Sequence, residues 1–197
     1  MKKVIFATGN EGKMKEIREI LGDLDIELLS LKDAGIHADI VEDGKTFEEN
    51  AQIKAKAICD LTGEIVLADD SGLEVDYLDK APGIYSARFL GEDTSYDVKN
   101  TYILDKLTDV KGDDRSARFV CVIACFMPDG TSFTVRGTIE GIIADKISGE
   151  NGFGYDPIFY VPEFGCTTAE LPPEKKNEIS HRGRALAGAM EKLDRML

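Results

Sequence analysis

The stretch VIFATGNEGKMKEIREIL, Val4–Leu21, decides the fold class. Its first four residues form a short apolar run that is typical of a buried strand, and Thr8-Gly9-Asn10 predicts a turn after it. Apolar residues at helical spacing then predict a helix over 12–21: Met14, Ile17, Ile20 and Leu21. A buried strand that leads through a glycine-containing turn into an amphipathic helix is typical of an α/β protein.

The remaining elements extend this pattern along the chain. Strands are expected over 26–31, 65–69, 73–78, 117–127, 132–138 and 158–161, and helices over 47–61, over 95–107 and from Ser180 to the C-terminus. Thr46 and Glu49 form a capping-box pattern, and PDGT at 128–131 predicts a hairpin turn. Strands and helices alternate early and a hairpin comes late. We therefore expect one α/β domain, 1–197, with a mixed central β-sheet flanked by helices.

Charge and hydropathy exclude two classes of partner. The formal net charge of −13 argues against nucleic acid, because a duplex-binding surface needs a basic stripe. No segment reaches the roughly 20 apolar residues that cross a bilayer, and the apolar part of MKKVIFATGN is too short for a signal peptide. We expect a cytoplasmic protein without membrane contact, whose four cysteines, lacking CxxC spacing, are reduced.

Cations and an amide fall on the inward faces of three predicted helices. At about 100° per residue, Asn50 and Lys54 lie within the apolar stripe of the helix over 47–61. Lys13 and Arg182 project along the apolar sides of the first and last helices. Such side chains can lie on apolar surface and reach water with their charged ends, and this alternative stays open for each. If the three cations converge on one cleft, they would instead form a phosphate site.

The turn TGNEGK, Thr8–Lys13, leaves a strand and enters a helix, as phosphate-binding loops do. It is not a Walker A loop, because only two residues separate Gly9 from Gly12, and it is not a GxGxxG pattern. An ordinary connection and a ligand-binding loop fit this turn equally well.

ADDSG, Ala68–Gly72, places two carboxylates at the end of a predicted strand, where open α/β sheets bind ligands. Successive strand residues face opposite ways, so only one of Asp69 and Asp70 should face a cleft. A carboxylate there can hold Mg²⁺ and can orient or deprotonate a water molecule, and Glu42 is a second candidate ligand. Acids that merely end a strand are the alternative.

GENGFGYDP, Gly149–Pro157, surrounds Phe153 and Tyr155 with three glycines. Glycines let a backbone approach a ligand closely, and an aromatic ring there can stack on a base. The alternative is a tight turn that packs Phe153 into the core. His181 in ISHRG has no serine or cysteine partner at a nucleophile spacing, so we reject a hydrolase triad.

Six motifs in order resemble the inosine triphosphate pyrophosphatase family, which hydrolyses non-standard purine nucleoside triphosphates such as ITP, dITP and XTP. They span residues 7–183: ATGNEGK, TFEENAQIKA, ADDSGLEV, APGIYSARF, GENGFGYDPIF and ISHRG. The resemblance implies two lobes with the nucleotide cleft between them, and a homodimer. It also implies Mg²⁺-dependent hydrolysis between the α- and β-phosphates, which gives the nucleoside monophosphate and pyrophosphate.

The resemblance further implies roles for individual residues. Asp70 and Lys54 are the expected catalytic residues, with Asp70 as the base toward water, and Glu42 and Asp70 are the expected metal ligands. Phe153 is expected to stack on the purine. The expected substrate-binding residues are Thr8, Gly9, Asn10, Glu11, Gly12, Lys13, Ser71, Phe153, Gly154, Tyr155, Asp156, Lys176, His181 and Arg182.

The chain departs from the family pattern at Asp43, where many members have Thr, and this adds an acid near the expected metal. Lys175 adjoins Lys176, and the spacing to ISHRG favours Lys176. Two other functions fit the motifs: a pyrophosphatase for another modified nucleotide, and a nucleotide-binding regulator without turnover. A single-strand nucleic-acid binder is disfavoured by the net charge.

Overall fold

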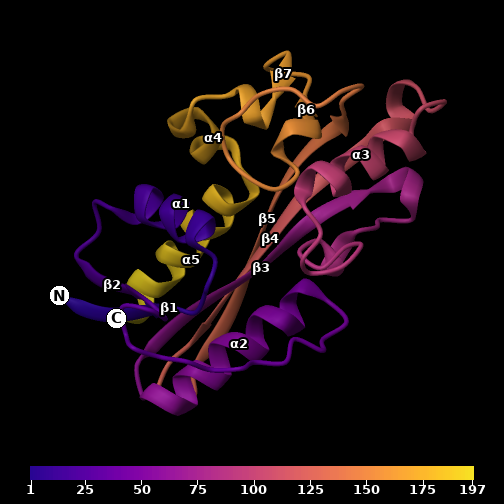
Figure 1. The fold of residues 1–197 in the computed structure, drawn as a ribbon. Coiled ribbons are helices and arrows are strands. Elements are labelled where there is room, and N and C mark those ends of the chain that lie inside the picture. Colours follow the sequence, from indigo (N-terminus) through magenta and orange to yellow (C-terminus); the bar gives the residue numbers. More distant parts are fainter. The chain divides into compact units, whose positions relative to one another are not determined.

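The computed structural model describes residues 1–197, and its elements follow one another as an α/β fold (Figure 1). The strands are β1 Lys2–Phe6, β2 Ile26–Ser30, β3 Ile65–Val75, β4 Ser116–Phe126, β5 Ser132–Ile143, β6 Phe159–Val161 and β7 Cys166–Thr167. The helices are α1 Glu11–Leu21, α2 Phe47–Thr62, α3 Tyr96–Lys106, α4 Pro173–Ile179 and α5 His181–Met196. The strands pair in the order β2-β1-β3-β4-β5-β6-β7, with parallel and antiparallel pairs. The mixed sheet with flanking helices is confirmed.

The chain divides into two compact units. Unit 1 comprises residues 1–70, 121–137 and 182–197, and unit 2 comprises residues 71–120 and 138–181. Strands β3, β4 and β5 therefore contribute residues to both units. Each unit has its own apolar core.

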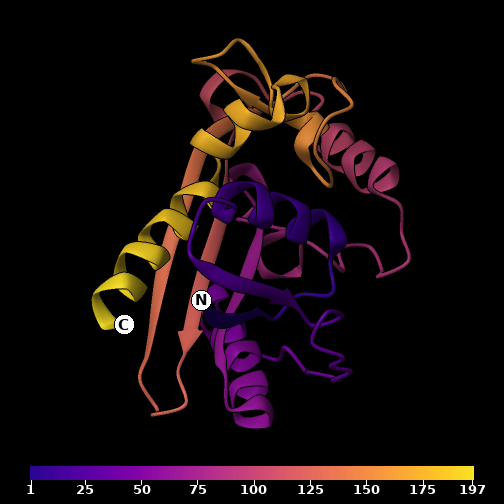
Figure 2. The same ribbon diagram turned by 90° about the vertical axis from the view of Figure 1, so that its left-hand side faces the viewer.

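In unit 1, β1 pairs in parallel with β2 and with β3. Helices α1 and α5 lie on one side of β1, and α2 lies on the other (Figures 1 and 2). Val4 and Phe6 belong to the core under α1 and α5, together with Ile17 and Leu186. Ile5, between them in the strand, is equally buried and points to the opposite face. Both faces of β1 are thus covered, as its continuous apolar sequence requires.

In unit 2, β6 pairs antiparallel with both β5 and β7. The core joins apolar residues of β3, α3, β4 and the segment before β6, among them Leu73, Ile103, Phe119 and Ile158. This core supports the loops that follow β3 and precede β6.

Helix α2 begins and ends where its sequence indicates. The Thr46 side chain accepts a hydrogen bond from the Glu49 N–H (3.1 Å), but the Glu49 carboxylate accepts from the Lys45 N–H (2.6 Å), so only half of the expected capping box forms. Gly63 closes the helix in the left-handed conformation (φ 68°). Leu61, in the last turn of this helix, is 63% exposed.

Three expectations about the strands and helices are corrected. The strands expected over 65–69 and 73–78 are one strand, β3, because all but two of its residues are buried and the polar DDS segment does not interrupt it. Strand β5 continues to Ile143, beyond its expected end at residue 138, and α4 is a further helix that the sequence did not predict.

All four cysteines are free thiols, as expected. No helix combines the length and the apolar character that a bilayer crossing requires.

Candidate functional site

The turn before α1 is ordered by its own polar side chains. The Asn10 side chain caps α1 by accepting from the Lys13 N–H (3.0 Å), and the Asn10 N–H donates to the Thr8 hydroxyl (3.1 Å). A Cβ built on Gly9 would meet no atom within 4 Å, so packing does not require glycine there. The Glu11 side chain is 91% exposed.

Three cations surround Asp69 in unit 1. The Lys13 Nζ lies 3.0 Å from the Asp69 Oδ2, and the Arg182 Nη2 lies 3.8 Å from the same oxygen. Asp69 is fully buried, and burial acts to raise its pKa. The charges of Lys13, Lys54 and Arg182 outweigh burial and hold the pKa of Asp69 well below its usual value. The three inward cations thus converge on Asp69, a carboxylate that is not among the expected site residues.

Arg182 is also tied to α1. Its side chain is 2% exposed and its Nη1 donates to the carboxylate of Glu16, which is itself buried. The alternative that Arg182 reaches water is therefore wrong. Removing one partner of a buried ion pair typically costs about 3–5 kcal/mol. Sequence reasoning missed Glu16, because no local pattern marks a contact with a residue so distant in the chain.

Helix α2 positions Lys54 and the loop that carries Glu42. The Lys54 Nζ lies 3.1 Å from the Glu42 Oε1. Burial lowers the pKa of Lys54, but Asp69, Glu42 and Asp70 reverse this effect and raise it, so the ammonium stays charged. Asn50 is 1% exposed, and its Oδ1 accepts a hydrogen bond from the Gly44 N–H (2.8 Å). The inward amide thus anchors the Glu42 loop to α2.

Asp70 lies in a different environment from its neighbour. Burial raises the pKa of Asp70 to about 6, against the opposing charges of Lys54 and Lys13. Its Oδ2 is buried and makes no hydrogen bond within the chain. Buried carboxylate oxygens are rarely left without a partner, and the exceptions need an explanation such as an ion or a ligand.

The two aspartates lie within β3 and not at its end, which corrects the expected placement. Strand β1 is the one that ends here: Phe6 pairs with Leu67, and the Ala7 N–H donates to the Leu67 oxygen (2.7 Å). Asp69 and Asp70 consequently lie just beyond the carboxyl end of β1, on the strand beside the turn that begins at Thr8. Ligands bind open α/β sheets at such an edge.

In unit 2, Asp156 organises a second group of expected site residues. Its Oδ2 accepts from the Phe153 N–H (3.0 Å) and from the Lys176 Nζ (2.7 Å), while the Thr168 hydroxyl donates to its Oδ1 (2.7 Å). The Lys176 Nζ lies 5.1 Å from the centroid of the half-buried Phe153 ring. Lys176 is buried and pairs with Asp156, whereas Lys175 is half-buried and pairs with Glu178.

Glycine is required at position 152 of this loop. Gly152 has a positive φ (+71°), and a Cβ there would lie 2.1 Å from the Asp156 Oδ2. The loop can therefore close tightly around the Asp156 carboxylate only without a side chain at this position.

Tyr155 and His181 are enclosed by unit 2. Tyr155 is 4% exposed and its hydroxyl donates to the Ser86 oxygen (2.6 Å), so its ring belongs to the core. His181 is 6% exposed and stacks on Phe119, with 4.8 Å between ring centroids. Ser71 is half-buried at the start of unit 2.

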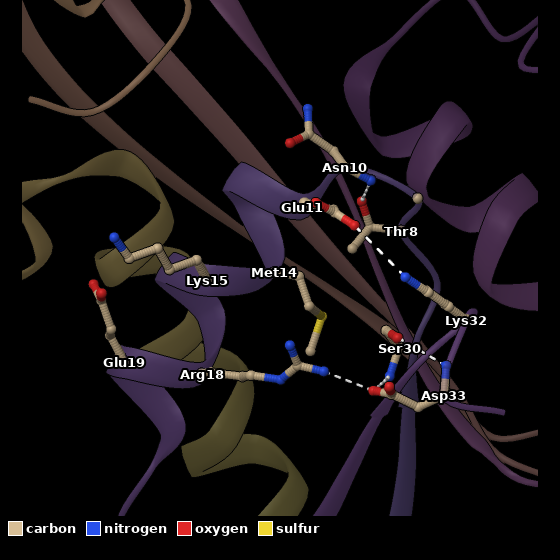
Figure 3. Close-up of a pocket in the computed structure, with 11 residues that line it drawn as sticks. Thr8, Asn10, Glu11, Met14, Lys15, Arg18, Glu19, Ser30, Lys32 and Asp33 are labelled. Atoms are coloured by element: carbon tan, nitrogen blue, oxygen red, sulfur yellow. Dashed lines mark hydrogen bonds and ion pairs between the residues drawn. The ribbon is translucent and has the colours of Figure 1, made fainter.

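A pocket of about 570 Å³ in unit 1 lies beside the turn before α1 (Figure 3). Thr8, Gly9 and Asn10 line it, but Lys13, Asp69 and Asp70 do not. Four of its charged groups form two pairs: Arg18 with Asp33 at 2.6 Å and Lys32 with Glu11 at 3.9 Å. The structure thus separates Glu11 from the cations around Asp69.

The mixed sheet, the glycine-containing turn before α1 and the cations around a buried carboxylate are typical of α/β proteins that bind phosphorylated ligands. The chain belongs to the Ham1 family, whose model matches residues 4–192. This finding confirms the family resemblance that the six motifs carry.

Relatives and solved structures match nearly the whole chain. The dITP/XTP pyrophosphatases of Desulforamulus reducens and Clostridium perfringens are each 50% identical to it; these alignments cover 98% and 100% of this chain and 96% and 100% of theirs. The Staphylococcus aureus Ham1 protein is 42% identical, with a TM-score of 0.89 and full coverage of both chains. A Mycobacterium abscessus nucleoside-triphosphatase / dITP/XTP pyrophosphatase is 41% identical, with a TM-score of 0.77 and coverage of 95% and 98%.

Proposed function

We propose that this protein hydrolyses non-standard purine nucleoside triphosphates, dITP and XTP among them, to the nucleoside monophosphate and pyrophosphate. The observation that carries the proposal is the buried group in unit 1: three cations around Asp69, with an Asp70 oxygen beside them that has no partner in the chain. Relatives that bear this activity in their names and match the whole chain support the same conclusion.

In this mechanism the triphosphate binds at the turn before α1. The N–H groups of the first helical turn favour anions, and the open space at Gly9 lets a phosphate approach the backbone. Lys13 and the charged Lys54 stabilise negative charge that develops on the transferred group. Arg182 pairs with Glu16 and lies near Asp69. We therefore expect its positive charge to act on the phosphates of the substrate and not on the purine.

Asp70 acts as the base toward the attacking water. With a pKa of about 6, its carboxylate is ionised at neutral pH and still basic enough to accept a proton. Oδ2, which has no partner in the chain, is the oxygen that receives it. The bond that breaks joins the α- and β-phosphates, as the family resemblance implies.

Asp70 and Glu42 are suited to hold Mg²⁺. Both offer carboxylate oxygens, which this ion prefers, and the chain gathers no group of three or more His, Cys, Asp and Glu side chains for a metal. Two carboxylates suffice where substrate phosphates and water complete the coordination. When bound, the ion supplies positive charge to the phosphate oxygens.

Residues of unit 2 would bind the base. The Phe153 ring would stack on the purine, held by Asp156 and Lys176. Discrimination for a 6-oxo purine requires N–H donors, because a 6-amino group leaves them unpaired, and such mismatches discriminate by about 10⁴-fold. His181 or backbone N–H groups would supply these donors.

Pyrophosphate release from a panel of triphosphates tests the proposal. We expect turnover of dITP, ITP and XTP that requires Mg²⁺, and much slower turnover of dATP, dTTP and UTP. Preference for dTTP or UTP would favour a pyrophosphatase for another nucleotide, and binding without release would favour a regulator.

A substitution at Asp70 tests its role as the base toward water. Asp70→Asn should abolish turnover, whereas Asp145→Asn, which removes a carboxylate that is 97% exposed, should not. Near-normal turnover in Asp70→Asn would refute the base role of Asp70.

From the family resemblance we also propose that the protein is a cytoplasmic homodimer. Light scattering at micromolar concentration measures the mass of the particle and so tests the dimer.

A further inference from the structure

Helix α3 turns two polar side chains inward. Lys99 is 1% exposed and Asn100 is 2% exposed, and Ile103 is the one apolar residue among those that the helix buries. A buried ammonium or amide is costly unless it is hydrogen-bonded. Each of these two side chains therefore needs a partner that explains its position.

Both partners are backbone carbonyls of loops. The Lys99 Nζ donates to the Ala87 oxygen (2.6 Å), and burial lowers its pKa. The Asn100 Nδ2 donates to the Gly154 oxygen (3.2 Å). The Asn100 Oδ1 is buried and makes no hydrogen bond within the chain, so the bond to Gly154 is the one that fixes this amide.

Tyr96 adds an aromatic contact to the same loop. Its ring meets Tyr155 edge-on, with 5.2 Å between centroids and 90° between planes. A Cβ built on Gly154 would lie 3.6 Å from the Tyr96 ring. The Tyr155 hydroxyl in turn donates to the Ser86 oxygen (2.6 Å). Helix α3 thus contacts residues 154 and 155 through Tyr96 and Asn100.

We propose that Tyr96 and Asn100 are positioning residues that fix the segment Phe153–Tyr155 for binding of the purine base. Gly154 has a positive φ (+65°), and glycine can leave that conformation readily once its carbonyl is released. A loose segment lets Phe153 move, so binding must then order it, which weakens affinity. This inference rests on the proposed function and on the role of Phe153 within it.

The consequence is specific to the base. The cations that would hold phosphates belong to unit 1, and Tyr96, Asn100 and Phe153 belong to unit 2. Loss of the α3 contacts should therefore weaken ligands that carry a purine and leave base-free polyphosphates unaffected.

Steady-state kinetics of the full chain with dITP, with inhibition by dIMP and by tripolyphosphate, tests the inference. In Asn100→Leu and Tyr96→Leu we expect KM for dITP and the inhibition constant of dIMP to rise about tenfold. We expect kcat to stay within about twofold and tripolyphosphate inhibition to be unchanged. Tyr96→Phe keeps the ring and should behave as wild type.

Ile103→Val is the matched control, because it shortens a buried side chain of the same helix and leaves both Tyr96 and Asn100 in place. If Asn100→Leu does not fold, the Tyr96 pair decides, since that side chain is 37% exposed. Unchanged KM in these variants, or an equal weakening of tripolyphosphate binding, would overturn this inference but not the proposed function. Wild-type protein that releases no pyrophosphate from dITP would overturn the proposed function and the inference with it.

Discussion

The surroundings of two consecutive aspartates of β3 shift their pKa values in opposite directions. Asp69 lies against Lys13 and Arg182, and these charges, with that of Lys54, lower its pKa despite complete burial. Asp70 is buried without a hydrogen bond to its Oδ2, and its pKa rises to about 6. Because successive strand residues face opposite ways, two adjacent positions can have such different partners.

The raised pKa of Asp70 predicts that its carboxylate destabilises the metal-free protein at neutral pH. The folded chain keeps the Asp70 proton up to about pH 6, whereas an ordinary carboxyl loses it near 3.8. The stability from this group is therefore complete below pH 3.8 and is lost as the pH rises through 6, by about 3 kcal/mol. Urea unfolding of Asp70→Asn in a metal chelator should show a higher free energy of unfolding than wild type at pH 8, and little difference at pH 4.

Asp69→Asn is the matched comparison, with the opposite sign. The depressed pKa of Asp69 means that its stabilisation is present above the ordinary pKa and is lost as the pH falls. That variant should be less stable than wild type at pH 8. If both substitutions lower stability at pH 8 alike, the contrast between the two carboxylates is refuted.

At the scale of elements, α2 carries Lys54 and also holds the loop of the expected metal ligand Glu42. The link is the hydrogen bond from the Gly44 N–H to Asn50. Asn50→Leu removes it, and we expect the Mg²⁺ concentration for half-maximal turnover to rise about 10–100-fold, as for other groups that orient metal ligands. Titration of Mg²⁺ at saturating dITP measures this.

Gly44→Ala should act in the same direction, because a Cβ there would lie 2.7 Å from the Asn50 Oδ1 and 2.8 Å from the Glu49 Cβ. Gln52→Leu, on the exposed face of α2, serves as the control. An unchanged Mg²⁺ requirement in both Asn50→Leu and Gly44→Ala would show that the loop does not depend on α2.

The sequence predicted those elements that are marked by a pattern within their own residues. Apolar periodicity identifies α1, α2 and α5, a capping pattern marks the start of α2, and the inward cations of these helices led to the phosphate hypothesis. The merger of two expected strands into β3 was not predictable in this way, because the polar residues Asp69, Asp70 and Ser71 are typical of a turn and the burial of the two aspartates comes from tertiary contacts. Glu16 was missed for the same reason: its partner Arg182 is 166 residues away in the chain.

At the scale of the whole molecule, the two units have separate cores but share three strands. Val66 and Leu73 lie in different units on β3, and β4 and β5 are divided in the same way. Because each of these strands continues from one unit into the other, loss of its order in one unit also removes hydrogen bonds and packing from the other. We therefore expect residues 1–197 to unfold as one cooperative domain, in line with the prediction from the sequence.

The distribution of natural probes makes this prediction testable without new labels. All six tyrosines lie in unit 2 and the chain has no tryptophan, so its fluorescence reports on unit 2 alone. Cys121 and Cys125 are fully buried in unit 1, and burial raises the pKa of each thiol to about 12, so both should react only after unfolding. In a Cys59→Ser, Cys166→Ser background, tyrosine fluorescence and thiol modification should give the same urea midpoint. Two separate midpoints would show that the units unfold independently.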